Sequence, residues 1–410
     1  MTTRDKIISF CDKAIYWEII AIPFVASFSS AAVNIFIGFL VFTFLVKQLS
    51  GGIKNTGPTS IDIPFAFLII IALVSFVNSV NMGSSIQGIF KLLKYGALLL
   101  IIPRQIKESG HIKRIVTAAL LGLLLASLDG VYQLIFGVDF FRHKPYDTVI
   151  GLARLKAAFP HTNIFAGYLA LFLPLSATLF LYHFKARSKL YSGIITFLGL
   201  FCLAFTFSRS AVLGLWLAIL ITGVIRRDKL VVSLLIASLL VAPFVLPKGI
   251  RKWSKTTHSA AEFLLNKERF VLNETSLNMI KHHPILGVGV NTYSLNYQKY
   301  KLHDTDEGTA NTMWYAHNIF LQMAGETGIL GLSAFLWLLA VLFKEWIKFY
   351  RRRKDDFSRI ATLGIIMGVF AFLVNGLAET NLYYPKIAVL FWFETSLLLG
   401  FFNLNKEGAK

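Results

Sequence analysis

The chain has 410 residues, of which 55% are hydrophobic and 15% are charged, and its mean hydropathy is +0.63. Its formal net charge is +19. A bilayer core requires about 20 apolar residues per helix, and the long apolar runs are continuous rather than alternating with polar residues, which excludes a transmembrane β-barrel. We therefore expect an all-α polytopic membrane protein.

About twelve segments are apolar enough to cross a membrane. The first two form one long stretch interrupted only by Ser27, Ser29 and Ser30. Eleven spans with an inverted N-terminus are therefore the alternative. The expected spans are residues 14–29, 30–47, 62–80, 85–103, 115–136, 163–182, 191–207, 210–225, 230–246, 328–347, 359–379 and 384–403.

The positions of lysine and arginine choose between these topologies, because short loops rich in them are retained in the cytoplasm. Placing the N-terminus inside puts every short basic loop on one side, so we predict twelve spans with both ends in the cytoplasm. The net charge is then mostly a topology signal, and we expect contact with membrane lipids and no nucleic-acid partner. The residues used are Arg4, Lys6, Lys13, Lys47, Lys54, Arg104, Lys107, Lys113, Arg114, Lys185, Arg187, Lys189, Arg226, Arg227, Lys229, Arg351, Arg352, Arg353, Lys354, Lys406 and Lys410.

The first span follows a basic N-terminus and lacks a small-residue cleavage site, so we expect a retained helix rather than a removed signal peptide. The two cysteines are Cys11, near the cytoplasmic edge, and Cys202, within a span. Neither can form a disulfide in the outer segments.

The topology divides the chain into spans one to nine over residues 1–246, a large outer loop over 247–327 that carries the candidate site, and three spans over 328–410. A smaller outer segment covers residues 137–162. Both outer segments are basic. Headgroup phosphates and a bound phosphate ligand are equally good explanations of that charge.

The large loop, whose core is residues 247–316, is expected to be partly helical. Glu268–Lys281 has the pattern of an amphipathic helix, with Phe270, Leu277 and Ile280 on one side and Arg269, Asn273 and Ser276 on another. His282 and His283 follow at its C-terminal end, where the helix dipole favours cations, and Pro284 ends it. We interpret these two histidines as helix caps.

A metal site in the loop is a weaker interpretation. The available ligands are His258, His282, His283 and His303 with Asp304 and Asp306, but no HExxH-type spacing is present. Asp304 to Asp306 alone is a weak match to the DxD pattern that binds a divalent ion in nucleotide-sugar enzymes. Asp304 to Asp306 is better explained as a solvated acidic turn, so we expect no metal.

Three cations lie where a membrane makes charge expensive. Arg209 lies between two spans at their outer boundary, and Lys91 and Lys94 share one face of the fourth span. Lys91 can extend its ammonium group to the interface. For Arg209 we favour a functional role, and for Lys94 both explanations stay open.

Several spaced motifs resemble those of the O-antigen ligase and O-antigen polymerase superfamily. His317 to Leu321 is followed by Glu326 to Gly331, and Arg269 is followed by the segment His283 to Gly289. Phe207 to Ser210 agrees as well, as do Arg154 to Phe159, Asn163 and Pro174. The resemblance extends from about residue 60 to 400.

This resemblance implies an inverting, metal-independent glycosyltransferase without a cofactor, at the periplasmic face of the bacterial inner membrane. Its donor would be a glycan on undecaprenyl diphosphate. For a ligase the acceptor would be lipid A-core oligosaccharide, and the product lipopolysaccharide. Polymerase is the alternative, because it has the same donor and leaving group. The size of the chain, the single large loop and the paired arginines favour ligase.

The chemistry also suits the residues themselves. Displacing a lipid diphosphate from a sugar needs a base for the acceptor proton, and His317 is the candidate. Arginines hold a diphosphate bidentately, so Arg209 and Arg269 are the expected clamp, with Lys94, Arg154 and Glu326 as further substrate-binding candidates. The structural alternatives are a helix-capping role for His317 and a first-turn acid at a helix N-terminus for Glu326.

A twelve-span transporter is the interpretation from another functional class. Transporters usually have related halves and midplane charges along a path. Here the halves look unrelated and the polar residues gather at the outer face, which favours an enzyme.

Overall fold

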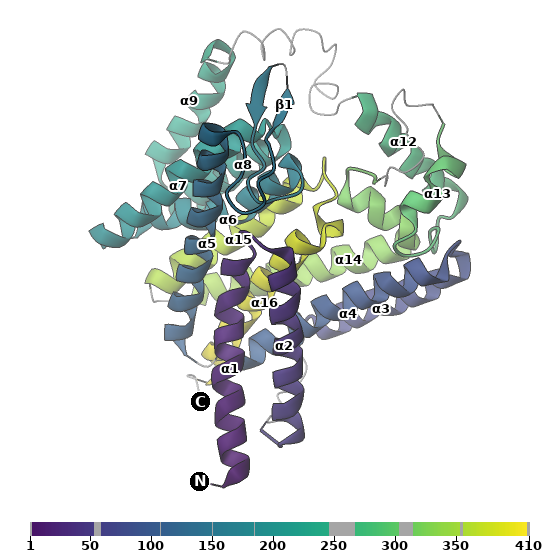
Figure 1. Cartoon of the computed structure of the whole chain (residues 1–410), viewed down its shortest axis with the longest axis horizontal. Coiled ribbons are helices and arrows are strands. Elements are labelled where there is room, and N and C mark those ends of the chain that lie inside the picture. The colour runs from purple at the N-terminus through teal and green to yellow at the C-terminus, as the bar shows by residue number, and fades with distance from the viewer. Residues whose placement is uncertain are drawn as a thin grey trace.

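The computed structural model describes residues 2–52, 59–106, 108–149, 151–183, 185–245, 267–302, 315–352 and 356–407, and helices dominate these ranges (Figure 1). The first nine helices are α1 (Thr3–Val25), α2 (Ser30–Leu49), α3 (Asp62–Val74), α4 (Met82–Gln105), α5 (Ser109–Phe136), α6 (Thr162–Tyr182), α7 (Ala186–Thr206), α8 (Arg209–Arg226) and α9 (Lys229–Val245). The others are α12 (Lys267–His282), α13 (Tyr293–Tyr300), α14 (Ile319–Arg352), α15 (Asp356–Asn375) and α16 (Pro385–Glu407).

Eight of the described helices are long and apolar enough to cross a membrane: α2, α4, α5, α6, α7, α8, α14 and α15. Two shorter apolar helices cover Asp62–Asn78 and Lys229–Ser238. A helix lies in each of the twelve expected segments. The prediction of an all-α polytopic membrane protein is confirmed.

The long N-terminal apolar stretch folds as two helices. α1 ends at Val25 and α2 begins at Ser30, with the Ser29 hydroxyl accepting a hydrogen bond from the Ala32 amide over 3.1 Å. The helices then run side by side (Figure 1). Serine is a favoured N-cap because its hydroxyl satisfies an amide that has no partner within the helix. The serines that interrupt the apolar run therefore mark a break between helices, in favour of twelve segments over eleven.

The centre of the bundle is α6, whose side chains are almost all buried between α7, α8 and α15. Glycines allow the close packing. A side chain at Gly368 of α15 would lie 2.0 Å from the Leu171 carbonyl oxygen of α6, and one at Gly214 of α8 would lie 2.5 Å from the Ala371 carbonyl oxygen of α15. Helices in membranes commonly pack through such small residues. This packing brings the ends of α8 and α15 close together.

The ends assigned to the cytoplasm also contact one another. Lys47 of α2 is buried, and its ammonium group lies 2.6 Å from the Asp12 carboxylate of α1. The same group donates to Gln105 Oε1 of α4 over 2.9 Å. Three helix ends that the topology places on one side are thus joined by a single lysine.

The first outer segment contains a β-hairpin that the sequence did not predict. Strands β1 (Asp147–Val149) and β2 (Leu152–Arg154) pair antiparallel, with Asp147 opposite Arg154 and a turn at Gly151, whose φ is +74°. After the hairpin, the Leu155 amide donates to the Phe205 carbonyl of α7 over 3.0 Å. This contact fixes Arg154 beside the end of α7.

The second outer segment contains α12 and α13, in agreement with the expected amphipathic helix. Phe270 and Leu277 are 55% exposed, whereas Leu272 and Met279 are buried against the tyrosines of α13. The apolar face that was singled out from the sequence is therefore not the face that packs inside the protein. Residues 247–266 and 303–314 of the expected cap lie outside the described residues.

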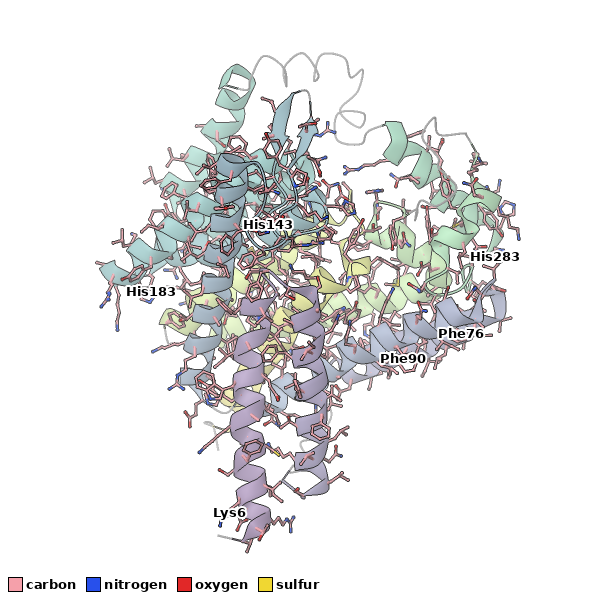
Figure 2. All side chains as sticks on the ribbon, viewed as in Figure 1. Lys6, Phe76, Phe90, His143, His183 and His283 are labelled. Atoms are coloured by element: carbon pink, nitrogen blue, oxygen red, sulfur yellow. The ribbon has the colours of Figure 1, made fainter. Side chains whose placement is uncertain are left out.

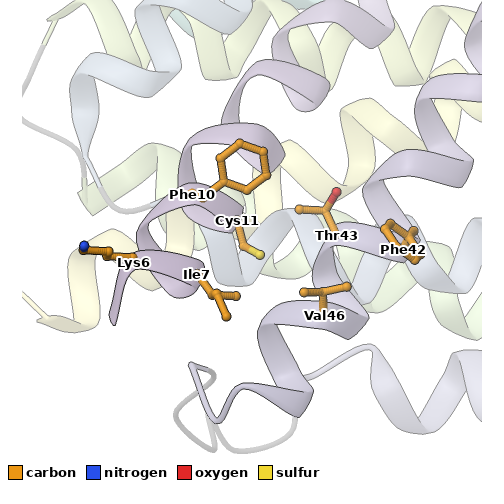
Figure 3. A pocket seen from close by; sticks show the side chains of 7 residues that line it. All are labelled: Lys6, Ile7, Phe10, Cys11, Phe42, Thr43 and Val46. Carbon is orange, nitrogen blue, oxygen red and sulfur yellow. The ribbon is translucent and has the colours of Figure 1, made fainter. Parts of the chain in front are cut away.

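A shallow apolar pocket lies between α1 and α2, and Figure 3 shows its lining, which includes Ile7, Phe10, Phe42 and Val46. It is near the N-terminal end of α1, on the opposite side of the molecule from α12 and α13 (Figure 1). Polar groups contribute little to this pocket, so it is not where the charged candidate residues meet.

Candidate functional site

The segment around His317 is fixed by hydrogen bonds on both sides. The Asn318 side chain caps α14 by accepting from the amides of Phe320 and Leu321 over 2.9 and 3.1 Å. Its amide nitrogen donates to the Leu377 carbonyl, and the Ile319 amide donates to the Gly376 carbonyl over 2.8 Å. The start of α14 is therefore attached to the chain that follows α15.

Glu379, in that same segment, is the residue that organises the site. Its side chain is 1% exposed. One carboxylate oxygen lies 3.1 Å from Nδ1 of His317, and the other accepts a hydrogen bond from Nη2 of Arg269 on α12. His317 remains 28% exposed, so the histidine has a buried carboxylate on one side and access to solvent or substrate on the other.

Sequence reasoning missed Glu379. It falls at the outer end of the expected eleventh span, where a single acid resembles an ordinary helix flank. The available signal was a carboxylate followed by Thr380 and Asn381, three polar residues in a row between two apolar spans. All three are buried in the structure, as a solvated flank would not be.

Arg154, in the second strand of the β-hairpin, also approaches the Glu379 carboxylate. Arg154 donates from Nε to the Thr206 carbonyl over 2.9 Å and from Nη2 to Asn163 Oδ1 over 2.6 Å. Burial lowers the pKa of Arg154, and the carboxylates of Glu379 and Asp147 act against that shift. Arg154 is thus near enough to Glu379 to interact with its charge.

Arg209 is the first residue of α8, and its positive charge is close enough to that of Arg269 for the two to repel each other. The adjacent Ser210 accepts from the Asn375 side chain over 3.2 Å, which joins the start of α8 to the end of α15. Arg154 and Arg269 interact with Glu379, and Arg209 interacts with Arg269. Asp147, beside Arg154, is balanced by its ion pair with Lys156, which leaves three arginine charges against the single charge of Glu379. The excess of two positive charges suits an anion such as a diphosphate.

Glu326 and Lys94 do not join this group by any described contact. Glu326 is buried on α14 and accepts from the amides of Asn291 and Tyr293 over 2.8 and 3.3 Å. Lys94 donates to Asn34 Oδ1 over 3.3 Å, whereas Lys91, expected on the same helical face, donates to Asn291 Oδ1 over 2.8 Å.

Two consecutive tyrosines separate Glu326 from Glu379. Burial and the nearby Glu326 carboxylate raise the pKa of Tyr383 well above its usual value, and Tyr384 lies near the Glu379 carboxylate. The Tyr315 ring packs against both. Tyr383 and Glu326 also line a mainly apolar cleft between α3, α4, α14 and α16, and none of the three arginines lines it.

A helix break lies at Gly328, within α14 and at the start of the expected tenth span. Gly328 has a φ of +67°, and a side chain there would lie 2.0 Å from the Ile285 carbonyl oxygen. Beside it, the Val288 and Gly289 amides donate to the carbonyls of Gly325 and Glu326, each over 2.9 Å. The turn after α12 is thereby attached to α14, which positions Arg269 relative to His317.

The histidines after α12 have protein partners. His282 Nδ1 lies 2.9 Å from the Asn278 carbonyl, one turn back in the helix, as a cap would, and His283 Nε2 lies 2.8 Å from the Tyr300 hydroxyl. His283 is also far from His143 of the first outer segment (Figure 2). In the part of the chain that the structure describes, no three His, Cys, Asp or Glu side chains form a metal-binding group. His258, His303, Asp304 and Asp306 lie outside that part.

The sequence model of the O-antigen ligase family matches residues 194–336. This segment contains Arg209, Arg269 and His317, so the resemblance stated from the motifs is confirmed there. The match supports a glycosyltransferase-like role in polysaccharide assembly, as a ligase or polymerase. It ends before Glu379, which the fold alone brings to the site.

Among known proteins, the chain is similar to the teichuronic acid biosynthesis protein TuaE of Bacillus subtilis (strain 168). The two are 23% identical over 353 residues, which cover 77% of this chain and 67% of the relative. The similarity therefore extends well beyond the segment matched by the family.

Proposed function

We propose that the protein is an O-antigen ligase, which moves a polysaccharide from undecaprenyl diphosphate to lipid A-core oligosaccharide at the periplasmic face of the bacterial inner membrane. The observation that carries this proposal is the meeting of three arginines, His317 and Glu379 at one place. In a lipid-linked donor the leaving group is a diphosphate, so the reaction needs fixed positive charge and a base close together.

His317 is the base in this mechanism. Glu379 lies beside Nδ1, so the neutral histidine carries its proton on Nδ1 and presents the lone pair of Nε2. Nε2 takes the proton from the acceptor hydroxyl as its oxygen attacks the anomeric carbon and the bond to the diphosphate breaks. Glu379 then stabilises the resulting imidazolium. Attack opposite the leaving group inverts the anomeric carbon.

The arginines stabilise the departing diphosphate. A guanidinium group offers paired donors to phosphate oxygens and stays charged during the reaction. Arg269 and Arg209 form the clamp, and Arg154 adds charge from the β-hairpin. Arginine is therefore sufficient for the role that a divalent ion has in other phosphate-displacing enzymes, and we propose a metal-independent reaction. Lys94 and Glu326 are assigned no direct contact with the diphosphate.

A second candidate is a polysaccharide polymerase, favoured by the similarity to a teichuronic acid biosynthesis protein. It would use the same donor, clamp and base, with the end of another glycan as the acceptor. A transporter is disfavoured, because the charged residues of the site lie at the ends of helices, where a buried carboxylate orients a partly exposed histidine.

Complementation separates the two candidates. The gene is expressed in one strain deleted for its O-antigen ligase and in another deleted for its polymerase, and lipopolysaccharide is analysed on gels. Restored attachment of long chains to lipid A-core in the first strain supports the ligase. Restored chain lengthening only in the second strain supports the polymerase, and restoration in neither contradicts both.

A further inference from the structure

The backbone at the candidate base is held by a short hydrogen-bonded relay on the first turns of α14. The Ala316 amide donates to Gln322 Oε1 over 2.7 Å, and Gln322 Nε2 donates to Glu326 Oε1 over 3.0 Å. Ala316 is directly before His317, and all three relay residues are buried. The relay thus runs from a buried carboxylate to the peptide that carries the histidine.

The Glu326 carboxylate favours one orientation of the Gln322 side-chain amide. A glutamine amide can usually be rotated to exchange its oxygen and nitrogen, but only its NH₂ group can donate to a carboxylate. Glu326 therefore fixes Gln322 with Oε1 facing the Ala316 amide. The Ala316 amide can only donate and favours the same orientation, and an apolar group in place of Glu326 would leave Gln322 Nε2 without this acceptor.

Glu326 is itself fixed by a different part of the chain. Its other oxygen accepts from the Asn291 amide over 2.8 Å, and the Asn291 side chain is bonded to Lys91 of α4. The turn that follows α12 and the outer part of α4 therefore meet at the origin of the relay. In a buried network of this kind every member is satisfied only when all the others are in place.

We propose that Gln322 and Glu326 are positioning residues, which orient the peptide of Ala316 and hence the His317 side chain for transfer. The inference rests on the proposed role of His317 as the base. Neither residue touches the arginines or Glu379 in the described structure, so their effect on the reaction passes through the Ala316 backbone.

The test uses the full-length protein in lipid nanodiscs and two variants, Gln322→Met and Glu326→Gln. The first keeps the length of the side chain but breaks both hydrogen bonds, and the second keeps the shape but removes the charge. Gln105→Leu is the matched control. Gln105 is also a buried amide and is hydrogen-bonded to a charged side chain, that of Lys47, but it lies at the end of α4 away from Lys91 and the relay.

Two quantities are measured: hydrogen exchange in peptides covering residues 315–321, and transfer from a glycan linked to polyprenyl diphosphate. For Gln322→Met we expect exchange at least about tenfold faster in these peptides, with kcat at least about tenfold lower and the donor KM within about twofold of wild type. Glu326→Gln should also speed the exchange and lower kcat, and Gln105→Leu should leave exchange and kcat at their wild-type values.

Unchanged exchange in Gln322→Met would overturn the relay. Faster exchange with wild-type kcat would overturn its role in positioning the base. If the wild-type protein transfers no glycan, the proposed function fails, while the exchange measurement still decides whether the relay holds the Ala316 peptide.

Discussion

At the level of single residues, Glu379 holds two groups that the proposed reaction needs in different ways. Its carboxylate orients the His317 ring and also holds Arg269, which has to stay available to phosphate. The ion pair with Arg269 anchors this buried carboxylate, because removing the arginine would leave its charge uncompensated. The histidine and the arginine are therefore positioned by a single side chain.

The first prediction concerns that carboxylate. Glu379→Gln keeps the size of the side chain but removes the charge that selects the Nδ1-protonated tautomer and stabilises the imidazolium. Transfer should fall by roughly a hundredfold or more, measured with a lipid-linked glycan in nanodiscs. Glu345→Gln is the control, since the ion pair of Glu345 within the described residues is a local one with Lys348 on α14. Equal activity of the two variants would remove Glu379 from the mechanism.

The second prediction concerns the clamp. Replacing Arg269 or Arg209 by Lys keeps the charge but loses the planar pair of donors, so transfer should fall by roughly tenfold or more while the protein still inserts in the membrane. Arg187→Lys is the control, because Arg187 is exposed near the start of α7, and its transfer rate should equal that of the wild type. Normal transfer by the double variant Arg209→Ala, Arg269→Ala would exclude the clamp.

At the level of elements, the kink at Gly328 attaches the turn after α12 to α14. The third prediction is that Gly328→Ala destabilises the protein by at least about 2 kcal/mol, because its positive φ is strained for alanine and the new methyl group meets the Ile285 carbonyl. Thermal unfolding in detergent measures this. Gly110→Ala in α5, where a side chain meets nothing within 4 Å, should unfold near the wild-type temperature. A similar temperature for both variants would contradict the account of the kink.

The elements that could be predicted from the sequence are those set by local pattern. Continuous apolar runs give the positions of the spanning helices, and Pro284 ends α12 as expected. The hairpin at residues 147–154 and the pairing of Glu379 with Arg269 could not be predicted. They depend on contacts between segments far apart in the chain, 110 residues apart for Arg269 and Glu379. The inward face of α12 was not evident either, because the tyrosines of α13 decide it.

At the level of the whole molecule, the residues that meet at the site come from five segments that the twelve-span topology places outside the membrane: the β-hairpin, the start of α8, α12, the start of α14 and the segment after α15. Lys47 joins helix ends that the same topology places inside. The proposed orientation in the membrane therefore agrees with the contacts at both the outer and the inner ends of the helices.

The fourth prediction tests that orientation by cysteine labelling. Both native cysteines are buried, so they give little background. Leu302→Cys, where Leu302 is 56% exposed, should react with a membrane-impermeant maleimide in spheroplasts, whereas Arg187→Cys should react only after lysis. Labelling of both variants from the same side would contradict the topology.

The most direct test of the proposed mechanism is the rate of glycan transfer by purified His317→Ala compared with wild type, with donor affinity measured on the same samples. Loss of a positioned base should lower the rate by roughly a hundredfold to ten-thousandfold with donor binding nearly unchanged, and a chelator should not slow the wild-type enzyme. Transfer by His317→Ala within tenfold of wild type, or complete inhibition of the wild type by a chelator that added magnesium or zinc reverses, would contradict the account.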